Sequence, residues 1–114
     1  MPVTIDQPLG EAICDALRAQ AARLGVLLGE EPCLASACIE ERRDPFSQEI
    51  SVQAIWRGAA RDGCINFFAD GRVFAEYQVL QAHPSLPGHY IEAVQVWGRV
   101  GNLRGEPVIA EFAA

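Results

Sequence analysis

Hydrophobic residues change their spacing once along the chain, near Pro32. Before this point, from Leu9 onward, they recur at intervals of three and four, which is the spacing of one face of an α-helix. After it they alternate with polar residues, which is typical of strands with one buried face. The pattern predicts an α+β fold in one domain, 1–114, with one N-terminal amphipathic helix packed on an antiparallel β-meander of five or six strands. The helix is expected at about 7–28, and the strands at about 33–42, 49–57, 64–69, 72–80, 90–100 and 107–112.

The predicted helix carries start and stop signals. Asp6 is expected to cap its N-terminus, and Pro8 is tolerated in the first turn because the N–H groups there have no intrahelical partner. Gly29 follows the last apolar residue, where a left-handed glycine commonly ends a helix. Gln20 interrupts the apolar face, and we expect it either to find polar partners in the core or to line a wet pocket.

Asp70-Gly71 lies between two strand-like runs and favours a hairpin with a two-residue type I′ turn. Such a turn sets Phe67 opposite Phe74 and Phe68 opposite Val73. One face of the hairpin then carries Phe68, Val73, Tyr77 and Val79, and the other carries Ile65, Phe67, Phe74 and Leu80.

One helix is too small to cover both faces of this sheet. A 20-residue helix is about 30 Å long and 10 Å wide, whereas neighbouring strands lie about 4.8 Å apart. Large apolar groups on the far face therefore predict an interaction surface, with Ile65, Phe67 and Phe74 as interface residues. The face can pack against a second copy, bind a different protein, or curl around the helix and enclose a ligand cavity. We favour the second copy, because closed homodimers are the commonest oligomers.

Composition narrows the classes of partner that we expect the chain to bind. The net charge is −6, and the nine basic residues, all arginine, are scattered along the chain. A nucleic-acid partner is not expected, because binding phosphates requires a basic stripe. No apolar run approaches the roughly 20 residues of a membrane span, and the first residues have no signal-peptide pattern, so we expect a cytoplasmic protein without a membrane partner.

The four cysteines do not form a recognisable site. Cys14, Cys33, Cys38 and Cys64 lack the paired spacing of zinc ligands. Disulfides are not expected in a reducing compartment. We predict buried free cysteines that act as small hydrophobes, with no metal and no cofactor.

The candidates for chemistry are few. His83 and His89 share one loop, and neither has the setting of a catalytic base or a metal ligand, so no catalytic residue is predicted. Trp56 and Trp97 occupy inward-looking strand positions and are predicted to be core residues. If a ligand pocket exists between the helix and the sheet, its predicted lining is Gln20, Trp56, Tyr77 and His89.

Two functions remain from the sequence. The first is a non-catalytic, homodimeric protein-interaction module that uses the open sheet face, with a different protein as a further possible partner. The alternative is a small-molecule-binding protein or minor enzyme with a pocket between the helix and a curved sheet.

Overall fold

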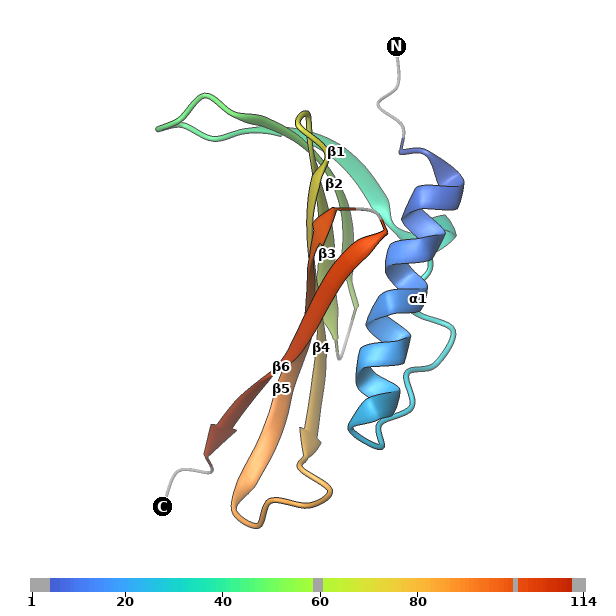
Figure 1. Cartoon of the computed structure of the whole chain (residues 1–114), viewed down its shortest axis with the longest axis vertical. Coiled ribbons are helices and arrows are strands. Elements are labelled where there is room, and N and C mark those ends of the chain that lie inside the picture. The colour runs from blue at the N-terminus through green and yellow to red at the C-terminus, as the bar shows by residue number, and fades with distance from the viewer. Residues whose placement is uncertain (1–4, 59–60, 100, 112–114) are drawn as a thin grey trace.

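One helix packs against one side of a six-stranded antiparallel sheet in the computed structural model of the chain (Figure 1). The predicted α+β fold with an N-terminal helix is confirmed. The structure describes residues 5–58, 61–99 and 101–111. Its elements are α1 (Gln7–Arg23), the short 3₁₀-helix η1 (Leu34–Ser36), β1 (Cys38–Arg43), β2 (Ile50–Arg57), β3 (Asp62–Phe68), β4 (Arg72–Ala82), β5 (His89–Arg99) and β6 (Asn102–Glu111).

The helix begins where the sequence predicts. Asp6 Oδ1 accepts a hydrogen bond from Leu9 N at 2.9 Å, which satisfies one of the free N–H groups of the first turn. Ile13 and Leu17 are fully buried against the sheet. α1 contacts β4, β5 and β6, so it covers one half of one sheet face.

The helix ends at Arg23, and the prediction that it continues to residue 28 was wrong. Gly25 adopts a φ of +76°, and its N–H bonds back to a carbonyl of the last turn at 3.0 Å. The next N–H, from Val26, bonds one residue further back at 3.0 Å, which completes a Schellman motif. Val26 is buried and turns the chain into the core. Gly25, and not Gly29, therefore supplies the left-handed residue that stops the helix.

The first predicted strand, 33–42, was wrong in its first half. Residues 34–36 form η1, and β1 starts only at Cys38. The cause is the Trp56 indole, whose Nε1 donates to the Cys33 carbonyl at 3.0 Å and to Ser36 Oγ at 3.1 Å. A buried indole N–H requires such partners. The segment turns to supply them before the strand begins.

The strands form a simple meander in the order β1-β2-β3-β4-β5-β6. β3 and β6 start earlier than predicted, at Asp62 and Asn102. β4 runs on to Ala82 through a bulge near Leu80, which has a φ of +52°. Positions 100 and 112, the predicted last residues of two strands, lie outside the described residues.

The β3–β4 register differs from the prediction by one residue. Phe67 lies opposite Val73, Asn66 opposite Phe74 and Ile65 opposite Ala75. The turn has three residues in place of two: Gly71 N bonds to the Phe68 carbonyl at 3.0 Å, and Gly71 takes a φ of +91°. This is the geometry of a three-residue hairpin loop that ends in a left-handed glycine.

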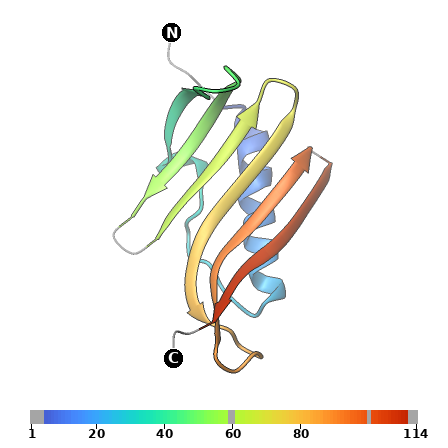
Figure 2. The ribbon, with the colours of Figure 1, turned by 90° about the vertical axis from the view of Figure 1, so that its left-hand side faces the viewer.

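The shift moves the side chains of β3 to the other face, because side chains alternate along a strand. Ile65 is 0% exposed and belongs to the core on the same side of the sheet as α1, and Phe67 packs against that core. The prediction that both belong to the open face is corrected by this register. Phe74 alternates with the buried Val73 and Ala75 along β4, so it does lie on the face that points away from α1. Figure 2 views this face, with α1 behind the strands.

Candidate functional site: the open face of the sheet

The face opposite α1 carries a continuous row of residues that crosses all six strands. Residues directly opposite each other in an antiparallel ladder share a face. The row is Glu40, Gln53, Asn66, Phe74, Trp97 and Arg104, one residue from each strand. The two apolar rings, Phe74 and Trp97, are therefore the fourth and fifth members of the row, and the other members are polar or charged.

Phe68, Phe74 and Trp97 form an aromatic hollow on this face. Together with Arg72, Val73 and Gly98 they line about 300 Å³ of space. All three rings are half-buried, so each keeps part of its surface open to solvent. The prediction that Trp97 is a core residue is wrong, because Trp97 pairs with Phe74 on the open face.

A polar hollow of about 320 Å³ adjoins the aromatic one, and Phe68 lines both. Its floor includes Ser51, Gln53 and Asn66, and the Gln53 amide donates a hydrogen bond to Asn66 Oδ1. Arg42, Arg43, Asp44 and Glu49 line its outer side. We call the two hollows together the open-face trough.

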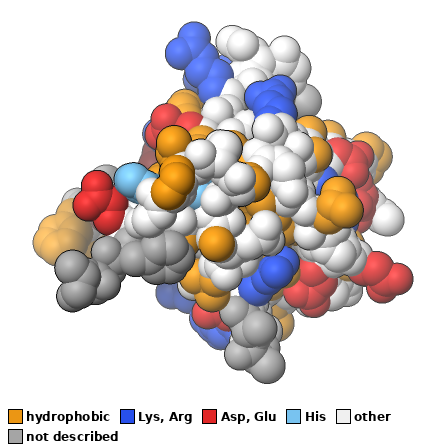
Figure 3. All heavy atoms as spheres, turned by 90° about the horizontal axis from the view of Figure 1, so that it is seen from below, with side chains coloured by type: hydrophobic (Ala, Val, Ile, Leu, Met, Phe, Trp, Pro, Cys, Tyr) orange, Lys and Arg blue, Asp and Glu red, His pale blue; other side chains and the backbone are white. Residues whose placement is uncertain are grey.

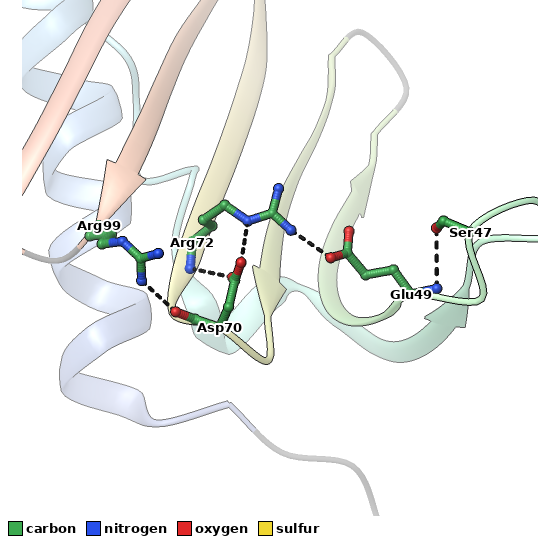
Figure 4. A network of polar contacts seen from close by, with 5 residues as sticks. All are labelled: Ser47, Glu49, Asp70, Arg72 and Arg99. Carbon is green, nitrogen blue, oxygen red and sulfur yellow. Dashed lines mark hydrogen bonds and ion pairs between the residues drawn. The ribbon is translucent and has the colours of Figure 1, made fainter.

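Arg72 holds the end of this trough through a charged network (Figure 4). Its guanidinium donates from Nε to Asp70 Oδ2 at 2.6 Å and from Nη2 to Glu49 Oε2 at 2.5 Å. The Cζ atom lies 4.6 Å from the centroid of the Phe68 ring, a cation–π distance. Arg99 donates to the Asp70 carbonyl on the other side. The network joins the β1–β2 and β3–β4 turns and the end of β5.

The charges in this network reinforce one another. The Arg72 backbone N–H, and then its guanidinium, lower the pKa of the Asp70 carboxyl below its ordinary value. The carboxylates of Asp70 and Glu49 raise the pKa of Arg72. All these groups are exposed, so each ion pair contributes little by itself. Their joint effect is to fix the shape of the rim.

The four residues predicted to line a ligand pocket are not brought together. Gln20 is 6% exposed, accepts a hydrogen bond from Arg23 Nη1 at 3.2 Å, and lines a hollow against β5 and β6 that contains none of the other three. The hollow that Trp56 lines contains none of the others either. Trp56 and Tyr77 do contact each other, but both are 2% exposed and belong to the core.

His89 lies at the start of β5, 3.5 Å from a Glu111 carboxylate oxygen, and its Nδ1 contacts the Pro87 carbonyl at 3.0 Å. Over residues 5–58, 61–99 and 101–111, no three His, Cys, Asp or Glu side chains are grouped as metal ligands. Within the same ranges, no helix has the length and apolar character needed to cross a membrane.

Sequence reasoning missed Phe68 and Trp97 as open-face residues. The signal that finds Phe68 is the polar alternation of β4, in which Arg72, Glu76 and Gln78 mark the solvent side. Aligning Asn66 of β3 with that side gives the observed register.

Comparison with known proteins gave no match: no family model, no curated protein and no solved structure is significantly similar to this chain.

Proposed function

We propose that the chain is a non-catalytic, homodimeric protein-interaction module that buries its open sheet face against a second copy. The observation that carries the proposal is the group of half-buried rings, Phe68, Phe74 and Trp97, on a face that no element of the described chain covers (Figure 2). Clustered apolar surface of this kind marks interaction sites.

The face has the area that a stable dimer needs. The six strands contain between 6 and 11 residues each. At about 3.3 Å per residue and about 4.8 Å per strand, the face measures roughly 30 by 24 Å, or about 700 Å². A standard interface takes about 800 Å² from each partner.

The chemistry of the face matches the anatomy of an interface. Aromatic residues are enriched at interface centres, and polar and charged groups are found at the rim. Here the rings are flanked by Glu40 at one end of the row and Arg104 at the other. A two-fold axis parallel to the strands sets each end of the row opposite the other end in the partner, so that acid faces base.

The edges of the sheet are less suited to pairing. The edge strand β1 reads Cys-Ile-Glu-Glu-Arg-Arg, and the edge strand β6 contains Pro107, which has no N–H to donate. Charges and proline are the features that prevent edge-to-edge pairing in natural sheets. The open face therefore supports association better than either edge.

Other exposed apolar side chains do not form a comparable surface. Leu27 is exposed in the α1–η1 connection, whereas Leu80 and Leu86 are exposed at the end of β4 and in the β4–β5 loop. Seen from the end with the β4–β5 loop, hydrophobic side chains lie among polar and charged ones (Figure 3). Scattered apolar residues of this kind are normal on a protein surface.

A cytoplasmic location is part of the proposal. Each of the four cysteines is a free thiol in the structure, and thiols stay reduced in the cytosol.

Sedimentation equilibrium over a range of protein concentrations tests the proposal. We expect a dimer for the wild type and a monomer for Phe74→Asp and Trp97→Asp, because a buried unpaired carboxylate opposes association. Leu27→Asp is the matched control, since Leu27 is 88% exposed in the α1–η1 connection. It should leave the dimer intact. A monomeric wild type, or a Phe74→Asp variant that associates like the wild type, would refute the proposal.

A further inference from the structure

Phe46 is the most exposed large apolar residue in the described chain, at 94%. It lies in the turn that joins β1 to β2, between Pro45 and Ser47. An aromatic ring held in water at the tip of a hairpin is unfavourable in an isolated chain. The ring therefore gains burial energy only by packing against a partner.

The turn is not a loose loop. Asp44 Oδ1 accepts hydrogen bonds from Phe46 N at 2.8 Å and from Ser47 N at 2.9 Å. The backbone closes twice more, from Asp44 N to the Glu49 carbonyl and from Gln48 N to the Asp44 carbonyl, both at 2.9 Å. Phe46 is thus presented by a preorganised turn, which lowers the entropy cost of inserting it into a partner.

The turn projects to the same side as the open face. Figure 1 shows the β1–β2 hairpin reaching away from the sheet on the side opposite α1, at the end that also carries the β3–β4 turn. The contact between Glu49 and Arg72 ties the base of the hairpin to that end. The turn that carries Phe46 and the aromatic hollow therefore lie on one side of the molecule, as a closed two-fold dimer requires.

We propose that the open-face trough of one chain receives the 44–49 turn of a second copy, with the Phe46 ring packed against Phe68, Phe74 and Trp97. The inference rests on the proposed dimer and names its anchor. The aromatic hollow, about 300 Å³ and lined almost wholly by apolar atoms, has room for one benzyl group. The adjoining polar hollow offers Ser51, Gln53 and Asn66 to the polar side chains of the same turn.

The trough of a chain is not filled by its own turn. Phe46 makes no extensive contact in its own chain, as its exposure shows, and the hydrogen bonds of the turn hold it in that position. In a two-fold dimer both troughs are filled, because each chain inserts its own turn into the trough of the other chain. A buried aromatic anchor in a pocket is the usual form of a binding hot spot.

Phe46→Ala tests the anchor. In sedimentation equilibrium we expect the dimer dissociation constant to rise on the order of 10- to 100-fold, the range of a hot-spot residue. The melting temperature of the dilute monomer should not change, because the ring touches little in its own chain. Leu27→Ala, which removes an exposed side chain in the α1–η1 connection, is the matched control and should leave the dissociation constant unchanged.

A mixing experiment distinguishes the anchor from a general loss of apolar surface. Phe46→Ala lacks the anchor and Trp97→Ala lacks part of the hollow, so each homodimer loses both anchor contacts. The mixed dimer keeps one intact contact, between the Phe46 of one chain and the complete hollow of the other. With one variant isotope-labelled, native mass spectrometry should show more heterodimer than the statistical half. Phe68→Ala replaces Trp97→Ala if the latter does not fold, as judged by circular dichroism.

The outcomes separate the two proposals. A statistical mixture, or an unchanged dissociation constant for Phe46→Ala beside a dimeric wild type, overturns the anchor and leaves the dimer. A monomeric wild type overturns both. An excess of heterodimer together with a weakened Phe46→Ala dimer supports both.

Discussion

Trp56 and Tyr77 meet edge to face across Gly63, with their ring centroids 6.0 Å apart and their planes inclined at 77°. Gly63 lies between them in the same cross-strand row, and its lack of a side chain lets the rings approach each other. Tyr77 Oη donates to Glu31 Oε2 at 3.0 Å, and Trp56 Nε1 donates to the carbonyl of Cys33, two residues further along the chain. The pair thereby fastens the connection between α1 and β1 to the sheet.

Gly63→Ala should destabilise the fold by about 1–3 kcal/mol, the usual cost of overpacking a core. A Cβ at this position overlaps the Tyr77 ring and lies 3.0 Å from the Glu76 carbonyl oxygen. Urea unfolding followed by tryptophan fluorescence measures the change. Gly29→Ala is the control: a Cβ there meets nothing within 4 Å, so its effect should stay within about 0.5 kcal/mol.

The Tyr77 phenol should titrate near pH 12. Burial, and then the hydrogen bond to the Glu31 carboxylate, raise its pKa from 10.0 to about 12. A raised pKa means that the neutral phenol stabilises the fold fully below pH 10, and that this contribution is lost as the pH rises from 10 towards 12. The difference in tyrosinate absorbance between wild type and Tyr77→Phe isolates this group from Tyr90. A phenol that titrates near 10 in the folded protein would contradict the buried placement.

Asp70 should contribute to stability at neutral pH and lose that contribution in acid. Its pKa is lowered from 3.8, so the contribution is present above that value and disappears as the pH falls below it. Asp70→Asn should therefore lower the melting temperature at pH 7, while the two proteins converge once the pH falls below the lowered pKa of Asp70. Because the group is exposed, salt should reduce the difference at pH 7. A difference that persists unchanged in strong acid would show that the Arg72 network is not its cause.

Phe67 and Phe74 should respond differently to the same substitution. Phe67→Asp places a carboxylate against the core and should cost several kcal/mol of unfolding free energy, as unpaired buried charges do. Phe74→Asp points away from the helix and should leave the stability of the dilute monomer nearly unchanged. Chemical denaturation at low protein concentration compares them. Equal losses of stability would contradict the register of β3 and β4.

The fold class was predictable because the period of the hydrophobic pattern changes once, from helical to alternating. The helix C-terminus was not, because Leu24, Leu27 and Leu28 continue the apolar spacing beyond Arg23, the last helical residue. Residues 24–28 follow the helix in the chain without being part of it, and only Val26 is fully buried there. A helical pattern in the sequence does not show where packing ends the helix.

The composition of the open face was predictable only in part. Asp70-Gly71 is compatible with a two-residue or a three-residue loop, and the choice moves every β3 side chain to the other face. The polar residues on alternate positions of β4 decide between them, since matching Asn66 with Glu76 and Gln78 on one face places Ile65 and Phe67 in the core. Phe46 carries no sequence signal, because its exposure depends on how the turn projects in space.

Association of two copies through the open face can be measured by isotope-filtered NOE spectroscopy on a mixture of labelled and unlabelled chains. The proposed dimer predicts intermolecular contacts from the rings of Phe74 and Trp97. Intermolecular contacts confined to β1 or β6, or no contacts in a sample that sediments as a monomer, would contradict it.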